Sequence, residues 1–226
     1  MAALLERYFP NVVAIQDEFV TATIQTLYMV FWTSLIAGIL GILLGIVLVV
    51  TRPNGILENR PLFEFLDKVI NVVRSIPFII LLTLLGTFTR FLVGTTIGET
   101  AALVPLIAGI IPFFARQIEM ALLEVDPGVV EAAEAMGTSP FGIIFRVYLP
   151  EGVAGIIRVS ALTVINVIGL TAMAGAVGAG GLGNLAITRG YNRFQTDVTI
   201  MATLIILVFV FISQFVSNLL IKRVSH

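Results

Sequence analysis

The chain has 226 residues, of which 58% are hydrophobic and 12% are charged, and its mean hydropathy is +1.05. These values exclude an ordinary soluble domain and are typical of a chain that lies mostly in a lipid bilayer. The formal net charge of -1, without a cluster of Lys or Arg, argues against a nucleic-acid partner. There is no cysteine, and the single histidine is His226, so thiol chemistry, a His-based zinc site and a Ser-His-Asp triad are not expected.

The first twenty residues carry charged side chains and Pro10 where a cleavable signal peptide needs an uninterrupted apolar stretch. A signal peptide is therefore not expected. We predict instead that residues 1–20 form a short amphipathic segment that lies at the membrane surface.

The next 200 residues contain long apolar runs. A helix rises about 1.5 Å per residue and the hydrocarbon core is about 30 Å thick, so roughly 20 apolar residues form one crossing. The runs are continuous and rich in Leu, Ala and Gly, which favours helices over the short alternating strands of a membrane barrel. The sequence therefore predicts an all-α, polytopic membrane helix bundle within residues 24–221. Its five predicted crossings are 24–50, 69–93, 100–120, 153–177 and 198–221.

The basic residues are unevenly distributed between the two ends of these crossings. Of the 13 Lys and Arg residues, nine fall on one side of the predicted bundle and four on the other. Cytoplasmic loops of membrane proteins carry the excess of Lys and Arg. We therefore predict a multi-pass protein whose N-terminus lies outside and whose C-terminus lies in the cytoplasm.

Packing signals occur in the first and third crossings. Gly41 and Gly45 form a G-x-x-x-G pattern, and Ala37 extends the same helix face. Small residues at this spacing let two helices approach closely, either within one chain or between subunits. Pro105 and Pro112 interrupt the third crossing, which is tolerated where neighbouring helices satisfy the freed carbonyl groups. The third crossing is therefore expected to face protein.

The longest polar connection, residues 122–152, lies on the predicted cytoplasmic side. Asp126 before Pro127 is typical of an N-cap followed by proline at the first helical position. Ser139 before Pro140 repeats this start signal. The connection is therefore predicted to contain two short, capped helices.

Two other signals end these helices. Gly137 predicts the end of the first helix, because glycine readily adopts a positive φ. The second helix is predicted to end at Leu149-Pro150. Such a loop can simply fold on itself, whereas small residues beside an exposed methionine favour docking into a groove of another protein. These small residues and the methionine are Ala132, Ala133, Ala135 and Met136.

The stretch EAAEAMGTSPFGIIFRVYLP (131–150) resembles the E-A-A, glycine and I-x-L-P pattern of permease subunits of ATP-binding-cassette importers. One position departs from the pattern, because Val147 stands where the family usually has Ile, a residue similar in size and branching. In that family this loop is the coupling helix, which binds the ATPase subunit and transmits its movement to the membrane helices. The resemblance implies an ATPase-coupling role for Glu131, Ala132, Ala133, Met136, Gly137, Leu149 and Pro150.

Three other stretches are similar to methionine-uptake permeases: VTRP (50–53), VRSIPFIILL (73–82) and GAVGAGGLGNLA (175–186). With the loop, the resemblance covers nearly all of the chain from the first crossing onward. It implies a single permease domain over residues 1–226 that takes up methionine, with other amino acids or small solutes as the alternative.

The same resemblance implies the partners. Five helices are few for enclosing a pathway, so we expect a symmetric homodimer with the path along its two-fold axis. The dimer is expected in a bacterial cell membrane, with two ATPase subunits and an extracytoplasmic substrate-binding protein. ATP and Mg²⁺ would be bound by the ATPase, and no cofactor by this chain.

The stretch AGAVGAGGLGN (174–184) has Gly178, Gly180 and Gly183 at the G-x-G-x-x-G spacing of a dinucleotide site. Such a site needs a preceding buried strand and an acidic residue about 20 positions later. Here a membrane-length apolar run precedes the glycines, and the next acid, Asp197, opens the following crossing. We therefore predict close backbone contact and a tight reversal at the outer end of the fourth crossing. Binding or hydrolysis of ATP by this chain is not expected.

Polar residues within a crossing are costly against lipid and are expected to face protein or a water-filled path. Asn166 is the strongest candidate for lining such a path, although helix packing explains any single position equally well. The Ser75-Ile76-Pro77 break in the second crossing frees a carbonyl that a polar substrate can meet. The predicted pathway residues are Ser75, Pro77, Thr163, Asn166 and Met173.

Two other classes of protein fit the composition less well. A secondary transporter usually places ionisable residues at mid-membrane, whereas the acids here fall near the predicted ends and loops. A membrane enzyme would need catalytic groups, and the crossings contain no histidine, no cysteine and no paired acids. Neither class is preferred over the importer permease.

Overall fold

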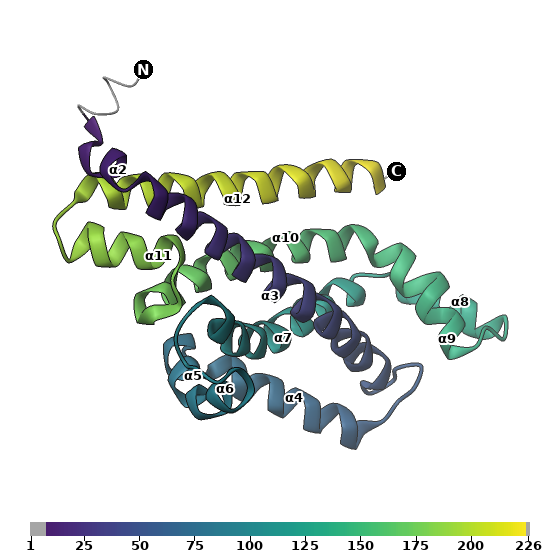
Figure 1. Cartoon of the computed structure of the whole chain (residues 1–226). Helices are drawn as coiled ribbons and strands as arrows, with labels where there is room; N and C mark the ends of the chain where they lie inside the picture. Colours follow the sequence, from purple (N-terminus) through teal and green to yellow (C-terminus); the bar gives the residue numbers. More distant parts are fainter. Residues whose placement is uncertain (1–7, 225–226) are drawn as a thin grey trace. The chain divides into compact units, whose positions relative to one another are not determined.

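The computed structural model describes residues 8–224, and every element in this range is helical (Figure 1). The predicted all-α fold is therefore confirmed. The first seven residues of the predicted amphipathic segment and His226 lie outside the described residues. In chain order the elements are α2 (Pro10–Ala14), α3 (Gln16–Thr51), α4 (Arg60–Ser75), α5 (Phe78–Leu84), α6 (Gly86–Val93), α7 (Glu99–Leu123), α8 (Pro127–Ala135), α9 (Pro140–Ile143), the π-helical η1 (Ile144–Tyr148), α10 (Leu149–Ala174), the π-helical η2 (Gly175–Ala179), α11 (Gly181–Leu185), the π-helical η3 (Ala186–Tyr191) and α12 (Thr196–Val224).

Four helical stretches in the described range are long and apolar enough to cross a membrane. The first of them starts before the predicted position 24, because α3 already begins at Gln16. Asp17 and Glu18 lie in its first turn, where acidic side chains stabilise the positive end of the helix dipole. Residues 16–20, predicted as part of a surface segment, therefore belong to the first long helix. The four stretches are Gln16–Thr51, Glu99–Leu123, Pro140–Ala179 and Thr196–Val224.

The second predicted crossing, 69–93, is not one continuous helix. It is divided among α4, α5 and α6, and Ile76 between α4 and α5 is extended, with φ -80° and ψ 121°. Pro77 explains this break, because a proline disfavours the helical conformation of the residue before it and cannot donate a backbone hydrogen bond. The break at Ser75-Ile76-Pro77 therefore lies where the sequence predicts it, and the second predicted crossing is built from three short helices.

The second helix of the loop does not end at Leu149-Pro150, as the sequence predicted. The chain instead passes through η1 into α10, and the N–H of Leu149 donates to the carbonyl of Ile144 in the wider π-type turn. This turn accommodates Pro150, whose ring would clash with the preceding carbonyl of a regular helix. The stretch that corresponds to the fourth predicted crossing therefore starts at Pro140 rather than at residue 153.

The contacts divide the chain into two compact units, each built from segments far apart in the sequence. The single domain predicted for residues 1–226 stays a prediction. Unit 1 comprises Met1–Leu35, Pro77–Ile107 and Val164–Ser213, and unit 2 comprises Ile36–Ile76, Ala108–Thr163 and Gln214–His226.

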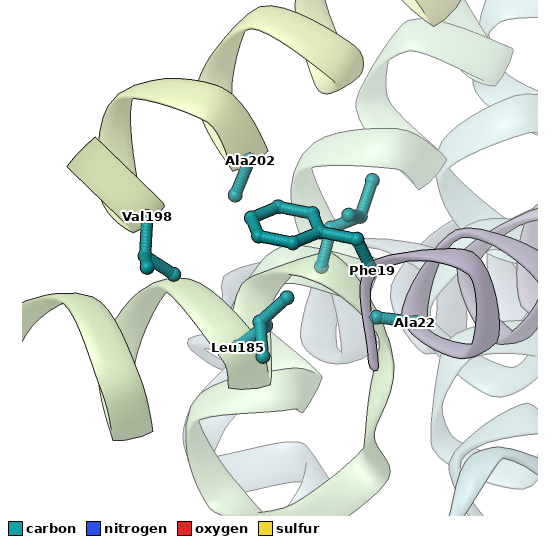
Figure 2. Packing of buried hydrophobic residues seen from close by; sticks show 6 residues of the cluster. Phe19, Ala22, Leu185, Val198 and Ala202 are labelled. Atoms are coloured by element: carbon teal, nitrogen blue, oxygen red, sulfur yellow. The ribbon is translucent and has the colours of Figure 1, made fainter. Parts of the chain in front are cut away.

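Unit 1 contains two buried apolar clusters. In the first, the Phe19 ring of α3 points toward Val198 and Ala202 of α12, with Leu185 of α11 beside it (Figure 2). The second surrounds the fully buried Met29. Both clusters join the first half of α3 to the segment that contains the glycine-rich stretch. The partners of Met29 are Ala102, Leu106, Ala174 and Ala179.

In unit 2 the G-x-x-x-G face of α3 packs against α7. A Cβ added at Gly41 would lie 2.7 Å from Cδ1 of Phe114, and one at Gly45 would lie 2.6 Å from Cγ2 of Ile118. Real Cβ atoms do not approach other atoms so closely. The packing seam that the sequence left open is therefore internal to the chain, and glycine is required for its close approach.

Replacing Gly45 by Ala is expected to lower the free energy of unfolding by about 1–3 kcal/mol, the usual cost of overpacking. The added methyl would also lie 2.8 Å from the backbone carbonyl oxygen of Ala115, which cannot move aside as a side chain can. Gly38→Ala is the matched control on the same helix, because a Cβ there meets nothing within 4 Å. Reversible unfolding in bicelles measures both variants, and equal stabilities would contradict the close packing.

Candidate functional site

The loop between α7 and α10 begins with two N-caps. The carboxylate Oδ1 of Asp126 accepts a hydrogen bond of 2.8 Å from the N–H of Gly128, and Pro127 occupies the first position of α8. The hydroxyl Oγ of Ser139 accepts one of 3.2 Å from the N–H of Gly142 at the start of α9. Both helix starts lie where the sequence predicts them. The caps satisfy N–H groups that have no partner within the helix.

The corner between these helices is a tight left-handed turn. Gly137 has φ 75°, and its N–H donates to the carbonyl of Glu134 over 2.8 Å. The next N–H, of Thr138, donates to the carbonyl of Ala133 over 3.0 Å. This pair of hydrogen bonds is the Schellman motif, which needs a residue that tolerates a positive φ. Gly137 therefore sets the direction in which the chain leaves α8.

Helix α8 has a buried side and an exposed side. Val130 and Ala133 are buried, and α8 packs against η1 within unit 2. Glu131, Ala132 and Met136 are exposed, and Met136 is 78% exposed. The predicted strip of small residues is thus split, because the helical period turns Ala133 toward its own unit while Ala132 faces outward. Ala133 supports the loop from within and is not an accessible contact in this chain.

The exposed side of the corner forms a shallow hollow of about 660 Å³. Beside Met136 lie Phe141 and Phe145, whose exposed fractions are 69% and 65%. These two rings are not among the residues predicted from the sequence. Their spacing of four positions could have indicated them, because residues at i and i+4 lie on one helix face. We call this region the corner surface; its lining residues are Met136, Gly137, Thr138, Ser139, Phe141, Gly142, Phe145 and Arg146.

The other two loop residues of the predicted coupling set lie at the start of α10. Leu149 is half-buried and Pro150 is exposed. Neither lines the corner surface. The predicted coupling residues therefore fall into two groups: those at or beside the corner, and Leu149 and Pro150, which begin α10.

A charged network joins α4 to α7 in unit 2. Nη1 of Arg116 donates to Oε2 of Glu119 over 2.6 Å, and Nη2 of Arg116 forms an ion pair with Asp67. The amide oxygen of Asn71 accepts a further hydrogen bond of 3.4 Å from Nη2. Glu119 is only 4% exposed, so its charge depends on this arginine. The sequence did not reveal this link, because 49 positions separate Asp67 from Arg116.

The predicted pathway residues lie in different environments. The buried Thr163 donates its hydroxyl to the carbonyl of Val159 in its own helix, over 2.8 Å. Asn166 is half-buried, and its side chain forms no hydrogen bond with the described residues. Met173 is 45% exposed and lies two turns further along the same side of α10. Asn166 and Met173 therefore stay candidates for a pathway, whereas the polar group of Thr163 is already satisfied.

The two remaining pathway candidates flank the break between α4 and α5. The hydroxyl of Ser75 donates to the carbonyl of Asn71 over 2.7 Å. Pro77 precedes the first residue of α5 and its carbonyl accepts hydrogen bonds from that helix. Ser75 and Pro77 are close because they are two positions apart in the chain, and each makes local hydrogen bonds.

The glycine-rich stretch is a tight reversal, as predicted, and three of its glycines have a positive φ: Gly178, Gly180 and Gly181. The N–H groups that open α11 already have protein partners in unit 1. Oε1 of Gln25 accepts from the N–H of Gly181 over 2.8 Å, and Oγ1 of Thr26 accepts from that of Leu182 over 2.9 Å. A phosphate site needs such N–H groups to be free. The geometry therefore disfavours a nucleotide at this segment.

The chain is similar in sequence to one family of transport components and to methionine transport permeases. Residues 37–226 match the family described as "Binding-protein-dependent transport system inner membrane component". The chain is 46% identical over 212 residues to the probable D-methionine transport system permease protein MetI of Vibrio cholerae serotype O1, with 93% of each chain covered. It is 46% identical over 217 residues to the methionine import system permease protein MetP of Bacillus subtilis, with 96% of this chain and 97% of that protein covered.

Solved structures agree with these relatives. The chain is similar to an inward-facing conformation of the MetNI methionine ABC transporter, with a TM-score of 0.92, 38% identity and coverage of 94% of this chain and 99% of that one. An amino acid ABC transporter solved with histidines shares the fold at a TM-score of 0.78 and 21% identity. These matches confirm the resemblance that the E-A-A loop indicated. The chain therefore belongs to the family of binding-protein-dependent transport system inner membrane components.

Proposed function

We propose that this chain is the membrane permease of an ATP-driven importer that takes up methionine, in its D or L form, or a closely related amino acid. The observation that carries the proposal is the 46% identity, over nearly the full chain, to methionine transport permeases of two organisms. The 38% identity to the MetNI structure supports the same substrate class.

The working assembly is a homodimer of this chain in a bacterial plasma membrane, with two ATPase subunits and an extracytoplasmic substrate-binding protein. ATP and Mg²⁺ are bound by the ATPase subunits, and this chain needs no cofactor. The N-terminus lies outside and the C-terminus lies in the cytoplasm, in accordance with the excess of Lys and Arg on one side. The similarity to the MetNI methionine ABC transporter supports the ATPase partner and the permease dimer. The match to binding-protein-dependent transport components supports the substrate-binding protein.

The corner surface is the proposed contact with the ATPase. Its exposed Met136 and aromatic rings offer an apolar anchor of the kind that buries deeply in a partner's groove. ATP binding draws the two ATPase subunits together, and each corner moves with its subunit, so the dimer opens outward to accept substrate. Hydrolysis returns it to the inward-facing state. The ATPase drives this cycle through its different affinity for the two conformations.

The test is ATP-dependent uptake by the reconstituted transporter. The chain is co-purified with its candidate ATPase and binding protein, placed in proteoliposomes, and supplied with labelled L- or D-methionine with and without ATP. We expect accumulation only with ATP, and competition by unlabelled methionine but not by serine. Uptake that persists without ATP and collapses with an uncoupler would contradict the proposal. If an unrelated solute competed with the labelled methionine and unlabelled methionine did not, methionine would not be the substrate.

Replacing Gly137 by Val is expected to uncouple ATP hydrolysis from uptake. A β-branched residue at φ 75° is strained by about 1–2 kcal/mol, so the corner opens and α9 leaves α8 in another direction. Methionine uptake should fall about tenfold while the ATPase stays active. Gly137→Asn is the matched control, because asparagine tolerates a positive φ. Equal uptake per ATP in the Val variant and the wild type would show that the corner geometry is not needed.

A further inference from the structure

Unit 1 contains a cavity that none of the predicted pathway residues lines. Its volume is about 320 Å³, within the range of roughly 300–1,000 Å³ that is usual for small-molecule sites. Its walls come from α5, α6, the start of α7 and η2, and include Leu82, Gly86, Ala101, Ala102 and Val177. The small residues leave the space open. A Cβ added at Gly86 would meet no atom within 4 Å.

The wall chemistry selects an uncharged group. No Asp, Glu, Lys or Arg is among the described residues that line the cavity. The wall also includes Thr89, which is 3% exposed and whose hydroxyl Oγ1 has no hydrogen-bond partner in the described chain. This oxygen is itself fully buried, so it offers no donor to a ligand in the cavity. An uncharged, mainly apolar group therefore fits this cavity best.

The cavity is open to the surface of the chain. Ile97 and Val177 line it and are 67% and 42% exposed, so its mouth reaches the surface of the chain there. A molecule with one apolar end and one charged end can place the first inside and leave the second at the mouth. Burying the charged end among these apolar walls would be strongly unfavourable.

We infer that this cavity receives the side chain of the transported amino acid and so contributes to selection of an apolar side chain. The inference rests on the proposed function and goes further by assigning a site. The methionine side chain is unbranched, flexible and uncharged, and its thioether sulfur is a weak hydrogen-bond acceptor. Its ammonium and carboxylate groups stay at the mouth.

Filling the cavity tests its role in transport. Gly86→Leu places a side chain in the open space without a backbone clash, and Gly38→Leu adds the same side chain to another helical glycine that also has nothing within 4 Å. In proteoliposomes that contain the complete transporter, Gly86→Leu should raise the KM for methionine about tenfold or more. Gly38→Leu should leave the KM unchanged.

Photo-methionine, a photoreactive analogue, tests contact directly in the same complex. After irradiation we expect labelled peptides from residues 82–105 or 174–179, with labelling competed by methionine, lost in Gly86→Leu and kept in Gly38→Leu. Two outcomes would overturn the cavity inference and leave the proposed function standing. In one, the wild type takes up methionine but these segments are not labelled. In the other, added phospholipid displaces the label and methionine does not. Absence of ATP-driven methionine uptake by the wild type would overturn both.

Discussion

Met136→Glu is expected to reduce ATP-driven uptake about thirtyfold while the chain stays folded, which corresponds to the loss of one strong interface anchor. Met136 is 78% exposed in the isolated chain and lies between the end of α8 and the corner at Gly137. A side chain in this position makes few contacts with its own unit, so its replacement should not affect folding. In the proposed complex the same side chain is buried against the ATPase, where a carboxylate would lose its hydration without gaining a partner.

The matched control is Met136→Leu, which keeps the side chain apolar and of similar volume. Its uptake should stay within about twofold of the wild type, since volume-conserving apolar replacements cost little. Co-purification with the ATPase gives a second readout, because the Glu variant should lose the ATPase during purification and the Leu variant should keep it. If the Glu variant transports as the wild type does, Met136 is not part of the ATPase contact.

Arg116→Met is expected to destabilise the chain by about 3–5 kcal/mol, because it leaves buried negative charge without a partner. Arg116 binds Glu119 on its own helix and Asp67 on α4, and Glu119 is 4% exposed. The midpoint of thermal unfolding in detergent should fall clearly. Replacing Glu119 by Leu in the same chain should restore part of the loss, because the unpaired buried carboxylate is then removed.

An exposed ion pair in the same unit provides the control. Nε of Arg60 lies 2.7 Å from Oε1 of Glu58, but the Arg60 side chain is 64% exposed. The N–H of Asn54 and the Arg60 guanidinium lower the pKa of Glu58, but water screens this pair. Arg60→Met should therefore change the unfolding midpoint little. A decrease as large as that of Arg116→Met would show that burial does not determine the cost of losing these pairs.

Features that depend on neighbouring residues were predictable. The caps at Asp126 and Ser139 and the turn at Gly137 use hydrogen bonds between residues at most five positions apart, so the residue types alone indicate them. The extended residue before Pro77 has an equally local cause. The all-α membrane class follows from the length and hydropathy of the apolar runs.

Features that depend on packing between distant segments were predicted wrongly or not at all. One local feature was also predicted wrongly: the second helix of the loop continues past Pro150, because a π-type turn over five residues accommodates a residue that usually ends a helix. Ala133 is buried although Ala132 beside it is exposed, since only the position of η1 determines which side of α8 is covered.

The sequence by itself determined the membrane class, the capped corner and the glycine reversal, because these follow from apolar length and from hydrogen bonds and backbone angles within a few residues. Only the tertiary structure decided that the G-x-x-x-G face packs on α7, that Gln25 and Thr26 bind the N–H groups of α11 from 156 positions away, and that a cavity opens beside Gly86. Such contacts depend on which surfaces meet after the chain has folded. A local pattern of residue types does not indicate which distant surfaces will pack together.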